Sequence, residues 1–135
     1  MQRLWATHHM RSNLSILLGT LVLAACASAP DDPASNPEAA APLACINKAQ
    51  CDLYWQRAQA WIAANSAFRV QHVTDTVIQT YGPTGATFAL AYTVVKTPSP
   101  DGSGRIAIAC DCGNLIRCEP TKTEATIAFK RFVRG

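Results

Sequence analysis

The chain has 135 residues, of which twelve are basic and nine acidic. Removing Arg3 and Arg11, which precede the first apolar segment, from the twelve basic residues leaves ten against nine acidic ones. The length of the chain suits one small domain. A chain whose basic and acidic residues nearly cancel lacks the basic surface that binding of nucleic acid requires. We therefore expect no nucleic-acid partner.

The first 26 residues have the three-part pattern of an export signal. Arg3 and Arg11, with no acidic residue nearby, favour retention of the N-terminus on the cytoplasmic side. Residues 14–25 form an apolar run of about a dozen residues, whereas a membrane-spanning helix needs about 20. The run therefore predicts a cleavable signal peptide and not a membrane span. Met10 is an alternative start, because Arg11 alone still provides a short basic region.

The apolar run ends in the sequence Leu23-Ala24-Ala25-Cys26. This sequence resembles the lipobox of bacterial lipoproteins, in which the cysteine is acylated and becomes the first residue of the mature chain. The resemblance implies a lipoprotein signal peptide over residues 1–25 and binding to a lipid bilayer through acylated Cys26. Ala27, in place of aspartate, implies the outer membrane, with the domain facing the periplasm. The alternative is an ordinary secretory signal that leaves Cys26 unmodified.

Residues 26–42 are expected to form a tether. After Cys26 the segment has four prolines and no large apolar side chain, which predicts an extended, solvated linker. Residues 43–135 then make one small domain. A core of this size is marginal, so covalent cross-links are expected to matter.

The domain is expected to contain one helix followed by four strands. Apolar residues recur at helical spacing from about Lys48 to Ala64, with Asn47 as the N-cap. Alternating apolar residues then predict strands at 68–81, 88–94, 106–110 and 125–130, the first with a bulge near His72 and the last also open to a helical reading. Short connections favour an antiparallel sheet with the helix across one face. The expected fold is therefore α+β with two layers.

Five cysteines follow Cys26, and outside the cytoplasm cysteines favour disulfides. The spacing favours Cys45–Cys51 and Cys112–Cys118, each closing a small loop. A bond from Cys51 to Cys110 is an alternative, because sequence does not choose among connectivities. Cys110 is otherwise the odd thiol, either packed on the inward face of a strand or joining two chains.

A metal or redox site is the sharper alternative for the same cysteines. Cys110, Cys112 and Cys118, with His72, are soft ligands of the types that zinc or copper prefers. A C-x-C pair is a weak signal, however, and the chain has no C-x-x-C. Disulfides are therefore favoured, and no cofactor is expected.

No catalytic set is recognisable in the sequence. The chain has no G-x-S-x-G, no S-x-x-K and no phosphate-binding loop. We expect a non-enzymatic envelope module that binds a protein or peptide, or else a structural lipoprotein without a specific ligand. The expected binding surface combines the loop at 98–104 with the turn Gly82–Gly85.

The globular part is also similar to small exported proteobacterial domains that have no assigned activity. The similarity rests on a cysteine before a Trp-containing helix and on the strand pattern Val-Thr-Asp-Thr-Val-Ile-Gln-Thr-Tyr at 73–81. It spans most of residues 45–133. The resemblance implies the same fold and transfers no catalytic residue.

Overall fold

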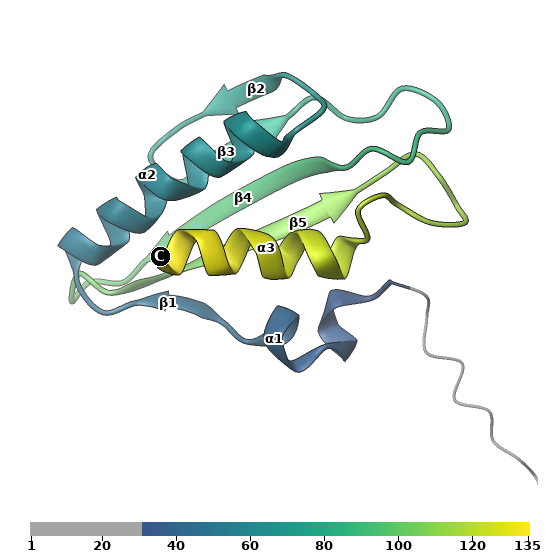
Figure 1. The fold of residues 1–135 in the computed structure, drawn as a ribbon. Coiled ribbons are helices and arrows are strands. Elements are labelled where there is room, and N and C mark those ends of the chain that lie inside the picture. The colour runs from purple at the N-terminus through teal and green to yellow at the C-terminus, as the bar shows by residue number, and fades with distance from the viewer. Residues whose placement is uncertain (1–30) are drawn as a thin grey trace, which may run out of the picture.

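The computed structural model describes residues 31–135 (Figure 1). The expected signal peptide, Cys26 and the first part of the expected tether lie outside the described residues. The elements are η1 (Pro33–Ser35), α1 (Pro37–Ala40), β1 (Leu43–Cys45), α2 (Lys48–Asn65), β2 (Val70–Val73), β3 (Val77–Thr80), β4 (Ala91–Pro98), β5 (Gly104–Asp111) and α3 (Lys122–Arg134). Among residues 31–135, no helix is long and apolar enough to cross a membrane.

The strands form one antiparallel sheet of five strands in the order β1-β5-β4-β3-β2. From β2 to β5 the chain runs as a meander, and β1 pairs with the outer side of β5. The expected α+β class and antiparallel sheet are therefore confirmed. The expected number of four strands is wrong. β1 was not predicted, the range 68–81 contains two strands, and the range 125–130 is part of a helix.

The range 68–81 is a hairpin and not one long strand. Thr74 turns the chain, since its side-chain oxygen accepts a hydrogen bond from the main-chain N–H of Val77 at 2.9 Å. β2 and β3 lie on either side of this turn, with a register irregularity between Val70 and His72. The other two expected strands are present with shifted ends, as β4 and β5.

The fourth expected strand, at 125–130, is part of helix α3. Thr121 caps this helix: its side chain accepts from the N–H of Glu124, and the Glu124 carboxylate accepts from the N–H of Thr121. This reciprocal arrangement is a capping box. The buried residues of α3 recur at helical spacing and are Ala125, Thr126, Phe129, Lys130 and Val133. The strand prediction was therefore wrong, and the helical reading applies.

Both long helices cover the same face of the sheet and lie side by side (Figure 1). Trp61 of α2 joins the layers, since its ring meets Tyr92 of β4 and Phe129 of α3 edge-on, at centroid distances of 5.3 and 5.4 Å. The strand side chains that point to this face are buried, among them Ile78, Tyr92, Val94 and Ile106. The core therefore lies between one face of the sheet and two helices.

Residues 31–42, which we call the N-terminal strap, are folded onto α3. Lys130 of α3 is buried, and its ammonium donates to the main-chain oxygens of Ala39 and Ala41, the latter at 2.6 Å. Burial lowers the pKa of Lys130. The expectation of an extended linker is therefore wrong from residue 31 onwards, because contacts with a distant helix order this proline-rich segment.

Two further contacts fix the strap. The Asp31 carboxylate accepts hydrogen bonds from the N–H groups of Lys122 and Thr123, at 2.7 and 3.0 Å, at the start of α3. Glu38 forms a two-point ion pair with Arg131, at 2.6 and 2.7 Å. The first residue that the structure describes is thus held at the N-terminus of α3.

The cysteines pair as the sequence spacing favoured. Cys45 is bonded to Cys51 and Cys112 to Cys118, and Cys110 is the free thiol of the described part of the chain. The first disulfide lies at the start of β5, where Cys45 pairs with Gly104, and the second follows the end of β5 at Asp111. The two disulfides therefore staple opposite ends of the sheet.

Candidate binding groove

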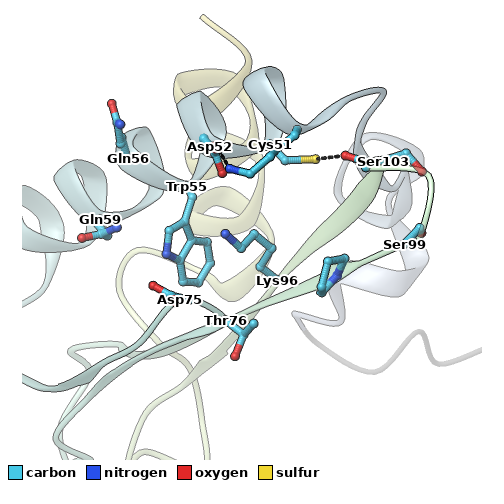
Figure 2. A pocket seen from close by; sticks show the side chains of 13 residues that line it. Cys51, Asp52, Trp55, Gln56, Gln59, Asp75, Thr76, Lys96, Ser99 and Ser103 are labelled. Atoms are coloured by element: carbon cyan, nitrogen blue, oxygen red, sulfur yellow. Dashed lines mark hydrogen bonds and ion pairs between the residues drawn. The ribbon is translucent and has the colours of Figure 1, made fainter.

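A groove of about 670 Å³ runs between α2 and the nearest strand ends (Figure 2). The first half of α2 makes one wall; the turn between β2 and β3, the end of β4 and the β4–β5 loop make the other. The polar residues that line it are Lys48, Asp52, Gln56, Gln59, Asp75, Thr76, Lys96, Ser99 and Ser103. We call this hollow the α2 groove.

The helix wall follows from the spacing of its polar residues. Asp52, Gln56 and Gln59 are four and three positions apart, so they share one face beside the buried stripe of α2. From Lys48 to Gln59 the helix rises about 1.5 Å per residue, which gives a wall about 16 Å long. The groove is therefore an elongated channel along the helix.

Trp55 and Lys96 form the floor of the α2 groove. The indole N–H of Trp55 donates to the main-chain oxygen of Thr74 at 3.3 Å, which holds the β2–β3 turn against α2. Lys96 of β4 places its ammonium 4.9 Å from the centroid of the Trp55 ring. A cation over an aromatic face is attracted by the ring. The lysine is thus positioned between the two walls (Figure 2).

The carboxylates lie on both walls. Asp52 of α2 pairs with Lys48 at 2.6 Å, and this hydrogen bond lowers the pKa of Asp52, helped by the charge of Lys96. Asp52 is therefore ionised at neutral pH. Asp75 stands on the opposite wall, in the β2–β3 turn. The groove presents acidic groups on either side of Lys96.

The β4–β5 loop closes one end of the groove and is internally ordered. Asp101 accepts from the N–H and the hydroxyl of Ser103, at 3.0 and 2.6 Å, and the hydroxyl hydrogen bond lowers the pKa of Asp101 most. Gly102 has a φ of +85°, and its oxygen lies 3.7 Å from the sulfur of Cys51. The loop expected to bind at 98–104 does line the groove.

The turn Gly82–Gly85 lies elsewhere, which corrects the other half of the expected binding surface. This turn precedes β4, whereas the loop at 98–104 follows it. β4 has eight residues, at about 3.3 Å per residue, so the two segments lie about 25 Å apart at opposite ends of the sheet. They do not form one surface.

The four residues considered as metal ligands are not brought together. Cys112 and Cys118 are bonded to each other, and Cys110 faces α3, with its sulfur 3.7 Å from the hydroxyl of Thr126. His72 is exposed on the outer strand β2 and pairs with Gln79. Over residues 31–135, no three His, Cys, Asp or Glu side chains are grouped to hold a metal ion.

The sequence predicted the β4–β5 loop as part of the binding surface but predicted neither the α2 wall nor the strand residues of the groove. The polar positions of α2 were recognisable from helical spacing. Asp75 and Lys96 are 21 residues apart, and only the β3–β4 pairing brings them together; the N–H of Lys96 donates to the oxygen of Thr76 at 2.8 Å. No local signal in the sequence marks such a pair.

Comparison with known proteins adds no assignment to this site. None of the family models, the curated proteins or the solved structures matches the chain. The similarity to bacterial lipoproteins and to small exported domains therefore stays a prediction from the sequence.

Proposed function

We propose that the chain is a lipid-anchored envelope lipoprotein whose domain binds an extended peptide segment of another envelope protein in the α2 groove, without catalysis. The observation that carries this proposal is the elongated groove with two polar walls and Lys96 between them. The resemblance of Leu23-Ala24-Ala25-Cys26 to a lipobox supports the anchor.

The dimensions and chemistry of the groove favour a peptide. A wall of about 16 Å matches about five residues of extended chain at about 3.3 Å per residue. Gln56 and Gln59 each offer amide donors and an acceptor, which suit the alternating N–H and C=O groups of a peptide backbone. Asp52 and Asp75 add positions for basic side chains of the ligand.

The groove offers little for chemistry on its ligand. Its lining in the described structure has hydroxyl groups but no histidine to activate them. The Ser103 hydroxyl donates to Asp101 within its own loop. The residues can bind and orient a ligand, which supports a non-enzymatic module.

Site-specific photo-cross-linking in intact cells tests the proposal. A photoreactive residue at Gln56, exposed in the groove, is compared with one at Gln79, which is equally a glutamine and exposed but lies on the uncovered sheet face. We expect a reproducible product from Gln56 alone, with the cross-linked peptide identified by mass spectrometry. Asp75→Lys should reduce its yield several-fold, because it places a cation where a basic side chain of the ligand is expected to bind.

Two results would contradict peptide binding. Equal products from Gln56 and Gln79 would mean contact without a defined site. No product from Gln56, in cells where deletion of the protein alters envelope permeability, would favour a structural lipoprotein instead.

A further inference from the structure

The loop closed by Cys112–Cys118 carries an apolar tip. Leu115 and Ile116 have relative exposures of 104% and 82%, the highest of the large apolar residues that the structure describes. Asn114 holds this tip, since its side-chain oxygen accepts from the N–H groups of Ile116 and Arg117, at 2.8 and 3.2 Å. The disulfide and these hydrogen bonds keep both side chains directed outwards. Two adjacent apolar side chains held in water indicate a surface that is covered in use.

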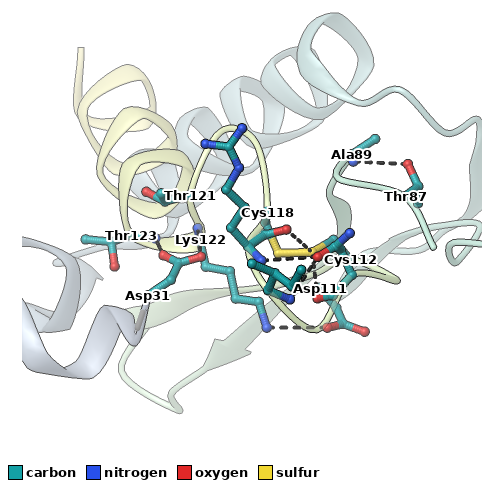
Figure 3. The surroundings of a disulfide bond; sticks show 12 residues. Asp31, Thr87, Ala89, Asp111, Cys112, Cys118, Thr121, Lys122 and Thr123 are labelled. Atoms are coloured by element: carbon teal, nitrogen blue, oxygen red, sulfur yellow. Dashed lines mark hydrogen bonds and ion pairs between the residues drawn. A yellow bond between two sulfur atoms is a disulfide. The ribbon is translucent and has the colours of Figure 1, made fainter. Parts of the chain in front are cut away.

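This tip lies at the end of the domain where the described chain begins. Asp31 binds the start of α3 at Lys122, and the ammonium of Lys122 reaches Asp111 at 3.4 Å, directly before the disulfide loop. Figure 3 shows Asp31, Lys122, Asp111 and the disulfide together. The N-terminal strap and the apolar tip therefore share one end of the molecule.

The length of chain before Asp31 limits how far this end can be from the anchor. Cys26 precedes Asp31 by five residues, and an extended chain spans at most about 3.4 Å per residue, or about 17 Å. The tether expected from the sequence was longer, but the strap shortens it by folding from residue 31. An acylated Cys26 would therefore hold this end of the domain close to the bilayer.

The charges around the tip point to apolar contact with lipid. Arg117 pairs with Glu119 at 3.2 Å, and Lys122 pairs with Asp111, so the acidic groups beside the tip have basic partners. Among the described residues, the surface around the tip therefore has neither a strong positive patch nor an unpaired acidic one. Apolar side chains gain from leaving water for the boundary of the acyl chains.

We propose that Leu115 and Ile116 insert into the surface of the bilayer that carries the Cys26 anchor, as a second membrane contact that orients the domain. This rests on the lipid anchor of the proposed function. The β4–β5 loop and the α2 groove lie at the opposite end of β5 from the tip. The same orientation therefore places the β4–β5 loop and the groove on the part of the domain away from the membrane, where a peptide can reach it.

Quenching of tryptophan fluorescence by lipid tests the contact. The processed full chain is reconstituted in phosphatidylethanolamine–phosphatidylglycerol vesicles whose acyl chains carry bromine. Leu115→Trp and Ile116→Trp are compared with Ile46→Trp, a matched control that is 77% exposed and lies beside the other disulfide, at the far end of the sheet. The native Trp55 and Trp61, both buried, provide the same background in every variant.

We expect the emission added at positions 115 and 116 to be quenched several-fold more than that added at Ile46, while all variants float with the vesicles. Equal quenching at the three positions, in protein that still floats, would overturn the tip contact and leave the anchor intact. A blue-shifted emission at both tip positions without quenching would also overturn it, since protein would then cover the tip. Protein that does not float would refute the anchor and, with it, the oriented contact.

Discussion

Cys110 is the free thiol of the described chain, and its burial determines its reactivity. Burial raises the pKa of Cys110 to about 11, against a smaller opposing effect of the hydrogen bond with Thr126. Tyr92 pairs with Cys110 across β4 and β5, and burial raises the pKa of Tyr92 to about 12, with Cys110 adding to it. Both groups are therefore neutral at physiological pH.

We predict that Cys110 in the native protein reacts slowly with iodoacetamide. The thiolate is the reactive form, so a pKa of about 11 in place of 9.0 makes alkylation roughly a hundredfold slower at pH 8 than in the urea-unfolded, unreduced protein. Intact mass against time measures both rates. Rapid alkylation of the native thiol would contradict this and would revive a redox or metal role for Cys110.

The same two groups predict a loss of stability at alkaline pH. The folded state holds these protons to a higher pH than the unfolded state, whose values are near 9.0 for the thiol and 10.0 for the phenol. Their contribution to the free energy of unfolding is fully present below about pH 9 and is lost as pH rises towards 12. Urea unfolding from pH 7 to 11 checks this, and Cys110→Ala should flatten the part of the decline that begins near pH 9.

At the scale of elements, the sequence predicts helices and strands whose signals lie within the element, but not those features that depend on residues distant in the chain. The expected helix at 48–64 matches α2 within one residue, because its signals are local: Asn47 caps the helix and the apolar stripe lies within it. α3 was misread from alternation at 125–130, although the capping box of Thr121 and Glu124 precedes it. That pair was the signal that could have identified the helix.

The strap shows why composition alone misled. Its prolines and alanines resemble a linker, but its order comes from side chains about 90 residues further along the chain, such as Lys130. The residues of the candidate site likewise differ in whether the sequence could place them. Asp52 could be placed on a helix face from spacing, whereas Lys96 reaches the groove only through the sheet.

We predict that Asp31→Ala destabilises the domain by about 1 kcal/mol, because it leaves two N–H groups at the start of α3 without their acceptor and removes a negative charge from a helix N-terminus. Asp32→Ala is the matched control, since the Asp32 side chain accepts only from the N–H of Ala34, within the exposed η1 turn. Urea unfolding of the two variants in detergent measures the difference. Equal losses would mean that the strap does not depend on the Asp31 cap.

At the scale of the whole molecule, two disulfide bonds cross-link the chain at opposite ends of one sheet. Each joins cysteines six positions apart, and closing so small a loop stabilises a fold by about 2 kcal/mol. We predict that Cys45→Ser/Cys51→Ser and Cys112→Ser/Cys118→Ser each cost about this much. Their losses should add in the combined variant, because distant sites act independently. A combined loss that departs from the sum by more than about 1 kcal/mol would indicate that the two ends are coupled.

The proposed orientation also belongs to the whole molecule. The strap and the apolar tip lie at one end of the sheet, and the β4–β5 loop with the groove at the other. An anchor at Cys26 would make the first end face the membrane and the second face the surroundings. Both proposals therefore depend first on whether Cys26 is acylated.

The most direct test is the intact mass of the protein extracted from membranes in detergent. We predict a chain that begins at Cys26 with added acyl mass, one alkylated thiol after unfolding without reduction, and five after reduction, since Cys110 is free and two disulfides are present. A chain without acyl mass, found in the soluble fraction, would contradict the lipid anchor and make the protein a secreted one.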